Sequence, residues 1–214
     1  MKNYIKHQLF QLGIFNSLDL VRQLPKVAHW IRTGCTGNAP QPLKCMILSA
    51  YLKRYELTKF IETGTYHGNT LAYMAQQKNV HATSIELNET YYRVAEQRFS
   101  DYANVTTLYG DSGTLMPELI SQLRVPALFW LDGHYSGGET AKTNLETPIS
   151  AELEAILQST VKGHVILIDD ARCFDGTHDY PHLDRLLETV RVSNTYEIEV
   201  SVDIIRLTPT KLER

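Results

Sequence analysis

The sequence has few cysteines and no long apolar run, and both shortages exclude classes of protein. Its 214 residues include only Cys35, Cys45 and Cys173, with no C-x-x-C pair. We therefore expect the reduced thiols of a cytoplasmic protein rather than a disulfide framework. No window approaches the roughly 20 apolar residues of a membrane span, and the N-terminus MKNYIKHQLFQLG lacks the apolar core of a signal peptide.

Basic charge and two common catalytic signatures are lacking as well. The formal net charge is −3, so no excess of basic residues is available to neutralise phosphates, and we expect neither a nucleic-acid nor a membrane partner. The chain contains no G-x-S-x-G and no G-x-x-x-x-G-K-[ST], which argues against a triad hydrolase and a P-loop enzyme. What remains is the composition of an ordinary globular α/β domain, with 43% apolar and 21% charged residues.

From Lys59 onward, short apolar runs alternate with segments of helical period. Helices are expected at PISAELEAIL, at HLDRLLETV and after Ser112, which we expect to cap a helix. This alternation predicts a mainly parallel sheet, whereas YEIEVSVDIIRLT leaves no room for a crossover and predicts an antiparallel pair. The expected strands are KFIET, VHATSIEL, NVTTLYG, PALFWLD, HVILIDD, TYEIEVSV and DIIRLT.

Residues 1–57 precede the first expected strand of the sheet. Two segments in this part, SLDLVRQLPKVAHWI and PLKCMILSAYLKRY, have helical patterns. We expect them to form a helical arm or cap on the single domain, whose sheet occupies residues 58–214. A contact between two copies of the chain through this arm is a further expectation, giving a homodimer.

Every central strand is followed by a carboxylate. Ligands of parallel sheets bind beyond the carboxyl ends of the strands, and gathering acids there is costly unless cations or hydrogen-bond donors meet them. A single loop acid is usually only solvated, but five strand ends with acids are hard to explain in that way. These acids are Glu62, Glu86, Asp111, Asp132 and the pair Asp169 and Asp170.

The stretch FIETGTYHGNT has the form of a loop that holds a nucleotide-like cofactor. Its spacing, Gly64-x-x-x-Gly68 with Tyr66 between, differs from the dinucleotide fingerprint G-x-G-x-x-G. Glu86 lies about twenty residues further on, where an acid can accept the ribose hydroxyls of either NAD or an adenosyl cofactor. Asp111 adds an acceptor suited to an adenine amino group.

In this order, FIETGTYHG, SIEL, YGDSG and FWLDGHYSGG resemble the successive cofactor motifs of class I S-adenosylmethionine-dependent methyltransferases, over roughly residues 58–208. The resemblance implies a Rossmann-like α/β fold with a seven-stranded, mainly parallel sheet and a C-terminal antiparallel hairpin. It places the glycine loop at the methionine part of the cofactor, Glu86 at the ribose and Asp111 at the adenine. The implied cofactor-binding residues are Glu62, Thr63, Gly64, Thr65, Tyr66, Gly68, Asn69, Thr70, Glu86, Asp111, Ser112 and Asp132.

Asp132 together with Asp169 and Asp170 resembles the macrocin O-methyltransferase-like group, which methylates sugar or related hydroxyls with a divalent cation. The residues support a cation independently, because oxygen-only ligands suit Mg²⁺, Ca²⁺ or Mn²⁺. The alternative is that Asp170 caps the next helix or pairs with Arg172. His134 follows Asp132 by two positions, and we expect it to act as the general base, with Asp132 as substitute.

The sequence therefore predicts a methyltransferase that uses S-adenosylmethionine and Mg²⁺ or another divalent cation. The expected acceptor is a hydroxyl of a small molecule, such as a sugar or a phenol. Two alternatives stay open at this stage: an NAD-dependent oxidoreductase on a similar sheet, and a cofactor-binding subunit without catalysis.

Overall fold

The computed structural model describes residues 14–133 and 147–210. Within them, seven strands form one sheet in the order β3-β2-β1-β4-β5-β7-β6. The pairings along β3, β2, β1, β4 and β5 are parallel, and β7 pairs antiparallel with both β5 and β6. The strands are β1 (Lys59–Thr63), β2 (His81–Glu86), β3 (Val105–Tyr109), β4 (Ala127–Leu131), β5 (Val165–Ile168), β6 (Tyr196–Ser201) and β7 (Ile204–Pro209).

The predicted fold class is confirmed: this is a Rossmann-like α/β sheet that ends in an antiparallel hairpin. All seven expected strands are present, and only β7 extends beyond its predicted segment, by the single residue Pro209. The chain leaves β1 toward β2 and β3 and then returns to place β4 on the other side of β1. The strand order thus switches between β1 and β4, and ligands of open parallel sheets generally bind at such a switch.

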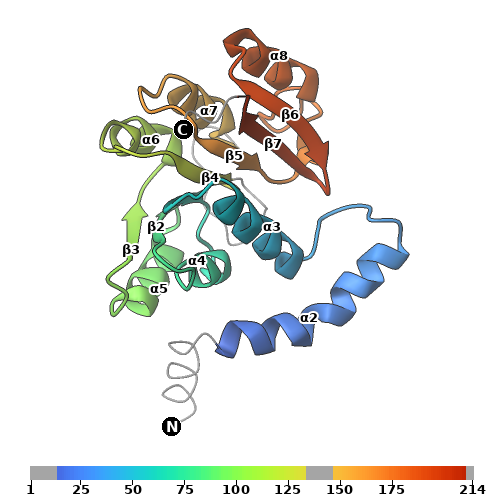
Figure 1. Cartoon of the computed structure of the whole chain (residues 1–214), viewed down its shortest axis with the longest axis vertical. Coiled ribbons are helices and arrows are strands. Elements are labelled where there is room, and N and C mark those ends of the chain that lie inside the picture. The colour runs from blue at the N-terminus through green and yellow to red at the C-terminus, as the bar shows by residue number, and fades with distance from the viewer. Residues whose placement is uncertain (1–13, 134–146, 211–214) are drawn as a thin grey trace.

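Helices cover both faces of the sheet (Figure 1). Apolar side chains alternate along the strands, so that Phe60 and Trp130 face one cluster and Ile61 and Phe129 face the other. Helices α3 (Gln41–Arg54), α4 (Asn69–Met74) and α5 (Glu89–Phe99) contribute to the first cluster. Helices α6 (Ser112–Ser121), α7 (Ile149–Leu157) and α8 (Leu183–Ser193) contribute to the second cluster.

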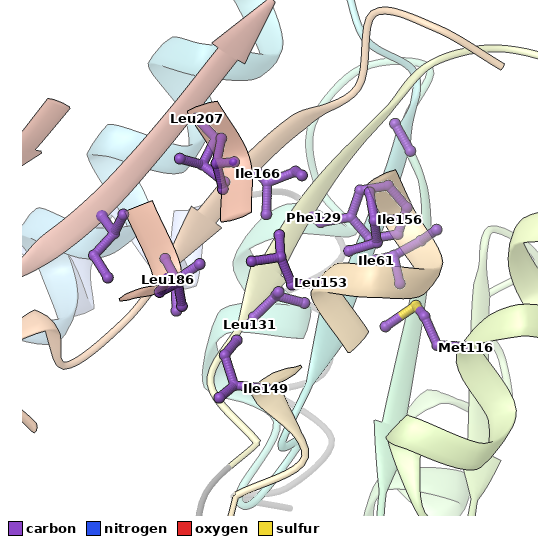
Figure 2. Packing of buried hydrophobic residues seen from close by; sticks show 14 of the residues in the cluster. Ile61, Met116, Phe129, Leu131, Ile149, Leu153, Ile156, Ile166, Leu186 and Leu207 are labelled. Carbon is purple, nitrogen blue, oxygen red and sulfur yellow. The ribbon is translucent and has the colours of Figure 1, made fainter. Parts of the chain in front are cut away.

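The second cluster joins the sheet to α6, α7 and α8. Figure 2 shows Leu153 and Ile156 of α7 reaching toward Phe129 on β4. These side chains are at most 3% exposed, as expected for residues on the apolar stripe of PISAELEAIL. The packing holds α7 against the sheet, and so positions any polar side chain that α7 carries on the same stripe.

Helix α2 (Ile14–Arg32) is arranged differently from the others. It contacts α3, but Figure 1 shows it extending away from the sheet. Trp30 near its end is buried, whereas Val21, Leu24 and Ile31 are at least half exposed. In the described parts of the chain, no helix combines the length and the apolar character that crossing a membrane requires.

Candidate functional site

The loop between β1 and α4 needs glycine at two positions because of the protein around it. Gly64 has a φ of 81°, and a Cβ atom there would lie 2.5 Å from the backbone oxygen of Asp132. Gly68 precedes α4 with a φ of 68°, and its Cβ would lie 2.9 Å from the ring of Phe99. The unusual glycine spacing therefore fits a loop packed tightly between the end of β4 and α5.

Tyr66, whose role the sequence left open, orients Glu86. Its backbone N–H donates to Glu86 Oε2 at 2.7 Å, and the N–H of Asn88 donates to Oε1 at 2.8 Å. Tyr66 adopts a φ of 48°, which is uncommon for a residue with a side chain. Its half-exposed ring contacts His67 and Tyr91. The Glu86 carboxylate is thus fixed at the end of β2, and each oxygen keeps a second lone pair for a ligand hydroxyl.

Other residues of the predicted cofactor set also hold the loop. Thr65 Oγ1 is 2.6 Å from Ser84 Oγ, and Thr70 Oγ1 accepts a hydrogen bond from Gln41 of α3 at 2.6 Å. Asn69 Oδ1 accepts a bond from Arg98 on α5. The side chains of this loop are therefore tied to β2, α3 and α5.

The predicted cap of α6 was placed one residue too late. Asp111, not Ser112, is the N-cap, since its Oδ1 accepts from the backbone N–H of Thr114 at 2.8 Å. The buried Ser112 hydroxyl instead donates to Glu152 of α7. Because its hydroxyl bonds to a buried carboxylate on another helix, Ser112 does not cap its own helix. A contact with a distant helix cannot be read from the local sequence.

Glu62 is a buried carboxylate with an unsatisfied oxygen. It ends β1 next to Thr63, is 1% exposed, and its Oε2 accepts no hydrogen bond from the described residues. Burial raises the pKa of Glu62 to about 8, and the nearby Glu86 adds to the effect, while a hydrogen bond with Ser84 opposes it. An acid held in this way fits a cationic ligand group, which would satisfy the free oxygen and favour the ionised form.

The structure brings the three predicted metal ligands together. Asp132, Asp169 and Asp170 each offer a carboxylate oxygen, and these oxygens lie within 4.8 Å of one another. Neighbouring parallel strands cause this convergence, because β4 and β5 end side by side and the Asp169 N–H donates to the carbonyl of Leu131. Burial, and then the charge of Asp169, raise the pKa of Asp132 well above its usual value.

Two cationic side chains already contact this acid cluster, defined as Asp132, Asp169 and Asp170. Arg172 forms an ion pair with Asp170 at 2.7 Å, which the sequence analysis considered as the alternative to a metal ligand. It also forms an ion pair with Asp203 in the β6–β7 turn. Lys44 of α3 forms a buried ion pair with Asp169. Sequence reasoning missed Lys44, although a lysine inside the apolar segment PLKCMIL is a signal that could have found it.

Glu152 is a second residue that the sequence analysis missed. It lies on α7, is 1% exposed, and shares hydrogen bonds with Ser112 and Thr63. Burial raises the pKa of Glu152 to about 7. Its place between Ile149 and Ile156 on the apolar stripe of the helix was the available signal, since a stripe position predicts burial.

A small hollow opens beside the acid cluster. Asp132, Asp169 and Glu152 contribute carboxylates to its wall, and Phe174 and Tyr180 contribute aromatic rings. The ring of Phe174 meets that of Tyr180 edge-on at 5.0 Å between centroids. The hollow therefore combines acidic groups with an aromatic wall. His134, the predicted base, lies outside the described residues.

Comparisons with known proteins connect this geometry to a fold. No protein-family profile matches the sequence, and no curated protein is significantly similar to it. Among solved structures, an O-methyltransferase from Bacillus cereus in complex with S-adenosylhomocysteine superposes with a TM-score of 0.60 at 15% identity, covering 88% of this chain and 90% of the other. The S-adenosylhomocysteine-bound methyltransferase PaMTH1 from Podospora anserina gives 0.58 at 14% identity, covering 88% of each chain.

Structures with other acceptors share the same architecture. The 23S rRNA methyltransferase ErmE superposes with a TM-score of 0.53 at 18% identity, over 81% of this chain and 70% of the other. Likeness at such low identity reports on the fold and not on the acceptor. Strand order, the terminal hairpin and these superpositions agree that the chain has the fold of class I S-adenosylmethionine-dependent methyltransferases.

Proposed function

We propose that this protein is a methyltransferase that uses S-adenosylmethionine to methylate a hydroxyl group of a small molecule, such as a sugar or a phenol, with the help of a divalent cation. The observation that carries the proposal is the acid cluster, whose oxygens lie within 4.8 Å of one another. It lies at the carboxyl ends of β4 and β5, and Gly64 of the glycine loop packs against Asp132. The cofactor loop and the acids thus meet at the switch in strand order.

The residues of the loop fit the cofactor. When bound, S-adenosylmethionine supplies a methyl group activated by the positive charge of its sulfonium. Glu62, with its unsatisfied buried oxygen, would receive the cofactor's ammonium group. Glu86, fixed by two backbone amides, would accept the ribose hydroxyls, and Asp111 keeps Oδ2 for the adenine while Oδ1 caps α6.

The acid cluster fits a hard cation such as Mg²⁺. All three donors are carboxylate oxygens, and Asp169 Oδ1 is buried without a hydrogen bond from the described residues. A bound divalent cation would hold the acceptor hydroxyl and lower its pKa. Asp132, Asp169 and Asp170 are the residues proposed to hold it.

The proton of the acceptor needs a base close to the reacting oxygen. In the cation-free protein, burial and the neighbouring carboxylate of Asp169 raise the pKa of Asp132. We keep His134 as the first candidate and Asp132 as its substitute. In either case the main task of the protein is to align the hydroxyl with the methyl group.

The proposal is tested by binding and by transfer. We expect S-adenosylhomocysteine to raise the melting temperature of the protein, because a ligand that binds only the folded state stabilises it, and NAD to leave it unchanged. Methyl transfer to a panel of sugars and phenols should then be lost in EDTA and restored by Mg²⁺. Stabilisation by NAD alone would overturn the proposed cofactor, and full transfer in EDTA would remove the cation from the reaction.

We further propose that the protein acts in the cytoplasm and pairs with a second copy through α2. Cys35, Cys45 and Cys173 form no disulfide within the described residues, which supports a reducing compartment. The exposed Val21, Leu24 and Ile31 on α2 support self-association.

A further inference from the structure

Lys44 carries its charge into the interior of the molecule. It belongs to α3, 125 residues before Asp169 in the sequence, yet its ammonium group pairs with Asp169 Oδ2. The side chains are 6% and 1% exposed, respectively. Burying a lysine to this extent is costly without a partner, so the contact with Asp169 is the reason that Lys44 is tolerated there.

The Lys44 ammonium and a divalent cation would both bind the carboxylate of Asp169, and two cations at one carboxylate repel each other. The three carboxylates of the acid cluster repel one another when they are ionised, and a neighbouring cation offsets part of that repulsion. Arg172 contributes from the surface, since its side chain is 40% exposed and is shared with Asp203. Lys44 contributes from inside, with its Nζ 6.0 Å from the centre of the Trp130 ring.

Asp169 shows that this compensation is incomplete. One of its oxygens pairs with Lys44, and the other, Oδ1, is buried and accepts no hydrogen bond from the described residues. A buried acceptor without a partner costs free energy. A single ammonium therefore satisfies half of this carboxylate, whereas a cation that binds several oxygens would satisfy more of it.

We propose that Lys44 is the built-in cation of the acid cluster and that a divalent cation binds there by displacing the Lys44 ammonium from Asp169. The inference rests on the cation site proposed above. Competition of this kind lowers the affinity for the divalent cation, and by linkage the bound cation weakens the hold of Lys44 on Asp169 to the same degree. Because Gln41 on the same helix bonds to Thr70 at the cofactor loop, α3 joins the cation site to the cofactor site.

The first experiment measures cation affinity without measuring activity. Mn²⁺ binding is followed by the electron paramagnetic resonance signal of free Mn²⁺, in the wild type and in Lys44→Met, which keeps the apolar stem and removes the charge. We expect Lys44→Met to bind Mn²⁺ roughly tenfold more tightly, a typical coupling between competing ligands. Lys53→Met is the matched control: it removes the same charge from an exposed position on the same helix, and its affinity should equal that of the wild type.

Asp169→Asn should weaken Mn²⁺ binding in both backgrounds. Equal or weaker binding by Lys44→Met than by the wild type would overturn the proposal. If neither protein binds Mn²⁺ while transfer from S-adenosylmethionine proceeds in EDTA, the cation site and the displacement of Lys44 both fall, and the methyltransferase activity stands.

The second experiment uses the unchanged protein, so it also decides the matter if Lys44→Met does not fold. Lysines are labelled by reductive methylation with and without saturating Mg²⁺ and are quantified by mass spectrometry. We expect Lys44 to be protected without Mg²⁺ and labelled severalfold faster with it, whereas the exposed Lys53 should be labelled equally in both conditions. Unchanged protection of Lys44 at saturating Mg²⁺ would contradict displacement.

Discussion

Glu62 and Glu152 illustrate at the scale of single residues how burial prepares a site for a ligand. Both are 1% exposed, and burial raises the pKa of Glu62 to about 8 and that of Glu152 to about 7. Glu152 has hydrogen bonds from Ser112 and Thr63 that offset part of the effect, whereas one oxygen of Glu62 has none from the described residues. The folded protein without ligand therefore favours the protonated form of Glu62.

The stability of the ligand-free protein should consequently depend on pH through Glu62. Its pKa in the folded state, about 8, lies above the ordinary value of 4.5, so its contribution is complete below pH 4.5 and is lost as the pH rises to 8. Because glutamine does not ionise, Glu62→Gln removes this loss of stability with rising pH. In urea denaturation, we expect the free energy of unfolding of the variant to rise relative to wild type between pH 5 and pH 8, by at most about 5 kcal/mol at ~1.4 kcal/mol per pKa unit.

The same variant should bind S-adenosylhomocysteine at least about tenfold more weakly, because the proposed partner of the cofactor's ammonium has lost its charge. Glu188→Gln, at an exposed position on α8, is the control and should change neither quantity. A difference in stability between Glu62→Gln and wild type that stays constant with pH would contradict the assignment.

At the scale of elements, the site depends on how the β1–α4 loop packs against the end of β4. Gly64 and Gly34 have nearly the same φ, 81° and 83°, yet a Cβ on Gly34 would meet no atom within 4 Å. The pair therefore separates two effects of replacing a glycine. Replacing Gly34 by alanine introduces backbone strain alone. Replacing Gly64 adds a steric clash with backbone atoms of Asp132, which cannot move aside as a flexible side chain could.

We expect Gly64→Ala to cost about 3 kcal/mol or more in the free energy of unfolding and Gly34→Ala about 1 kcal/mol, the ordinary cost of a left-handed alanine. Urea denaturation measures both. Gly64→Ala should also weaken binding of S-adenosylhomocysteine, which isothermal titration calorimetry measures, because the loop must move away from Asp132. Equal costs for the two variants would show that the loop yields easily at this contact.

At the scale of the whole molecule, α2 differs from the helices that cover the sheet. It extends away from the body (Figure 1) and exposes Val21, Leu24 and Ile31. Apolar side chains gathered on a projecting helix favour burial against another surface. A second copy of the chain is the partner we propose.

Replacing Val21 and Leu24 together by Glu should therefore shift the protein from dimer to monomer in size-exclusion chromatography with light scattering. Val192→Glu provides the control, because Val192 is 83% exposed on α8 and lies outside the proposed interface. The control should remain a dimer. A wild-type protein that is monomeric at every concentration, or a double variant that still dimerises, would exclude this interface.

Local pattern was enough to predict the strands and the convergence of three carboxylates at one edge of the sheet. Continuous apolar runs such as VILI indicate strands buried on both faces, and the short link between Ser201 and Ile204 permits only an antiparallel return. Parallel strands bring their carboxyl ends to one edge, so the convergence of Asp132 with Asp169 and Asp170 could be expected before any coordinates were seen. The predicted cap of α6 was one residue too late, because the hydroxyl of Ser112 bonds to Glu152 on α7 instead of to its own helix.

The sequence by itself determined the strands, their mainly parallel character and the row of acids that follows them, since these follow from periodicity and from the lengths of the connections. Only the tertiary structure decided which groups compensate those acids. Lys44 reaches Asp169 across 125 positions and Ser112 reaches Glu152 across 40, and contacts of that span depend on how helices dock on the sheet. The physical reason is that a buried charge requires a partner, while the identity of the partner is set by packing.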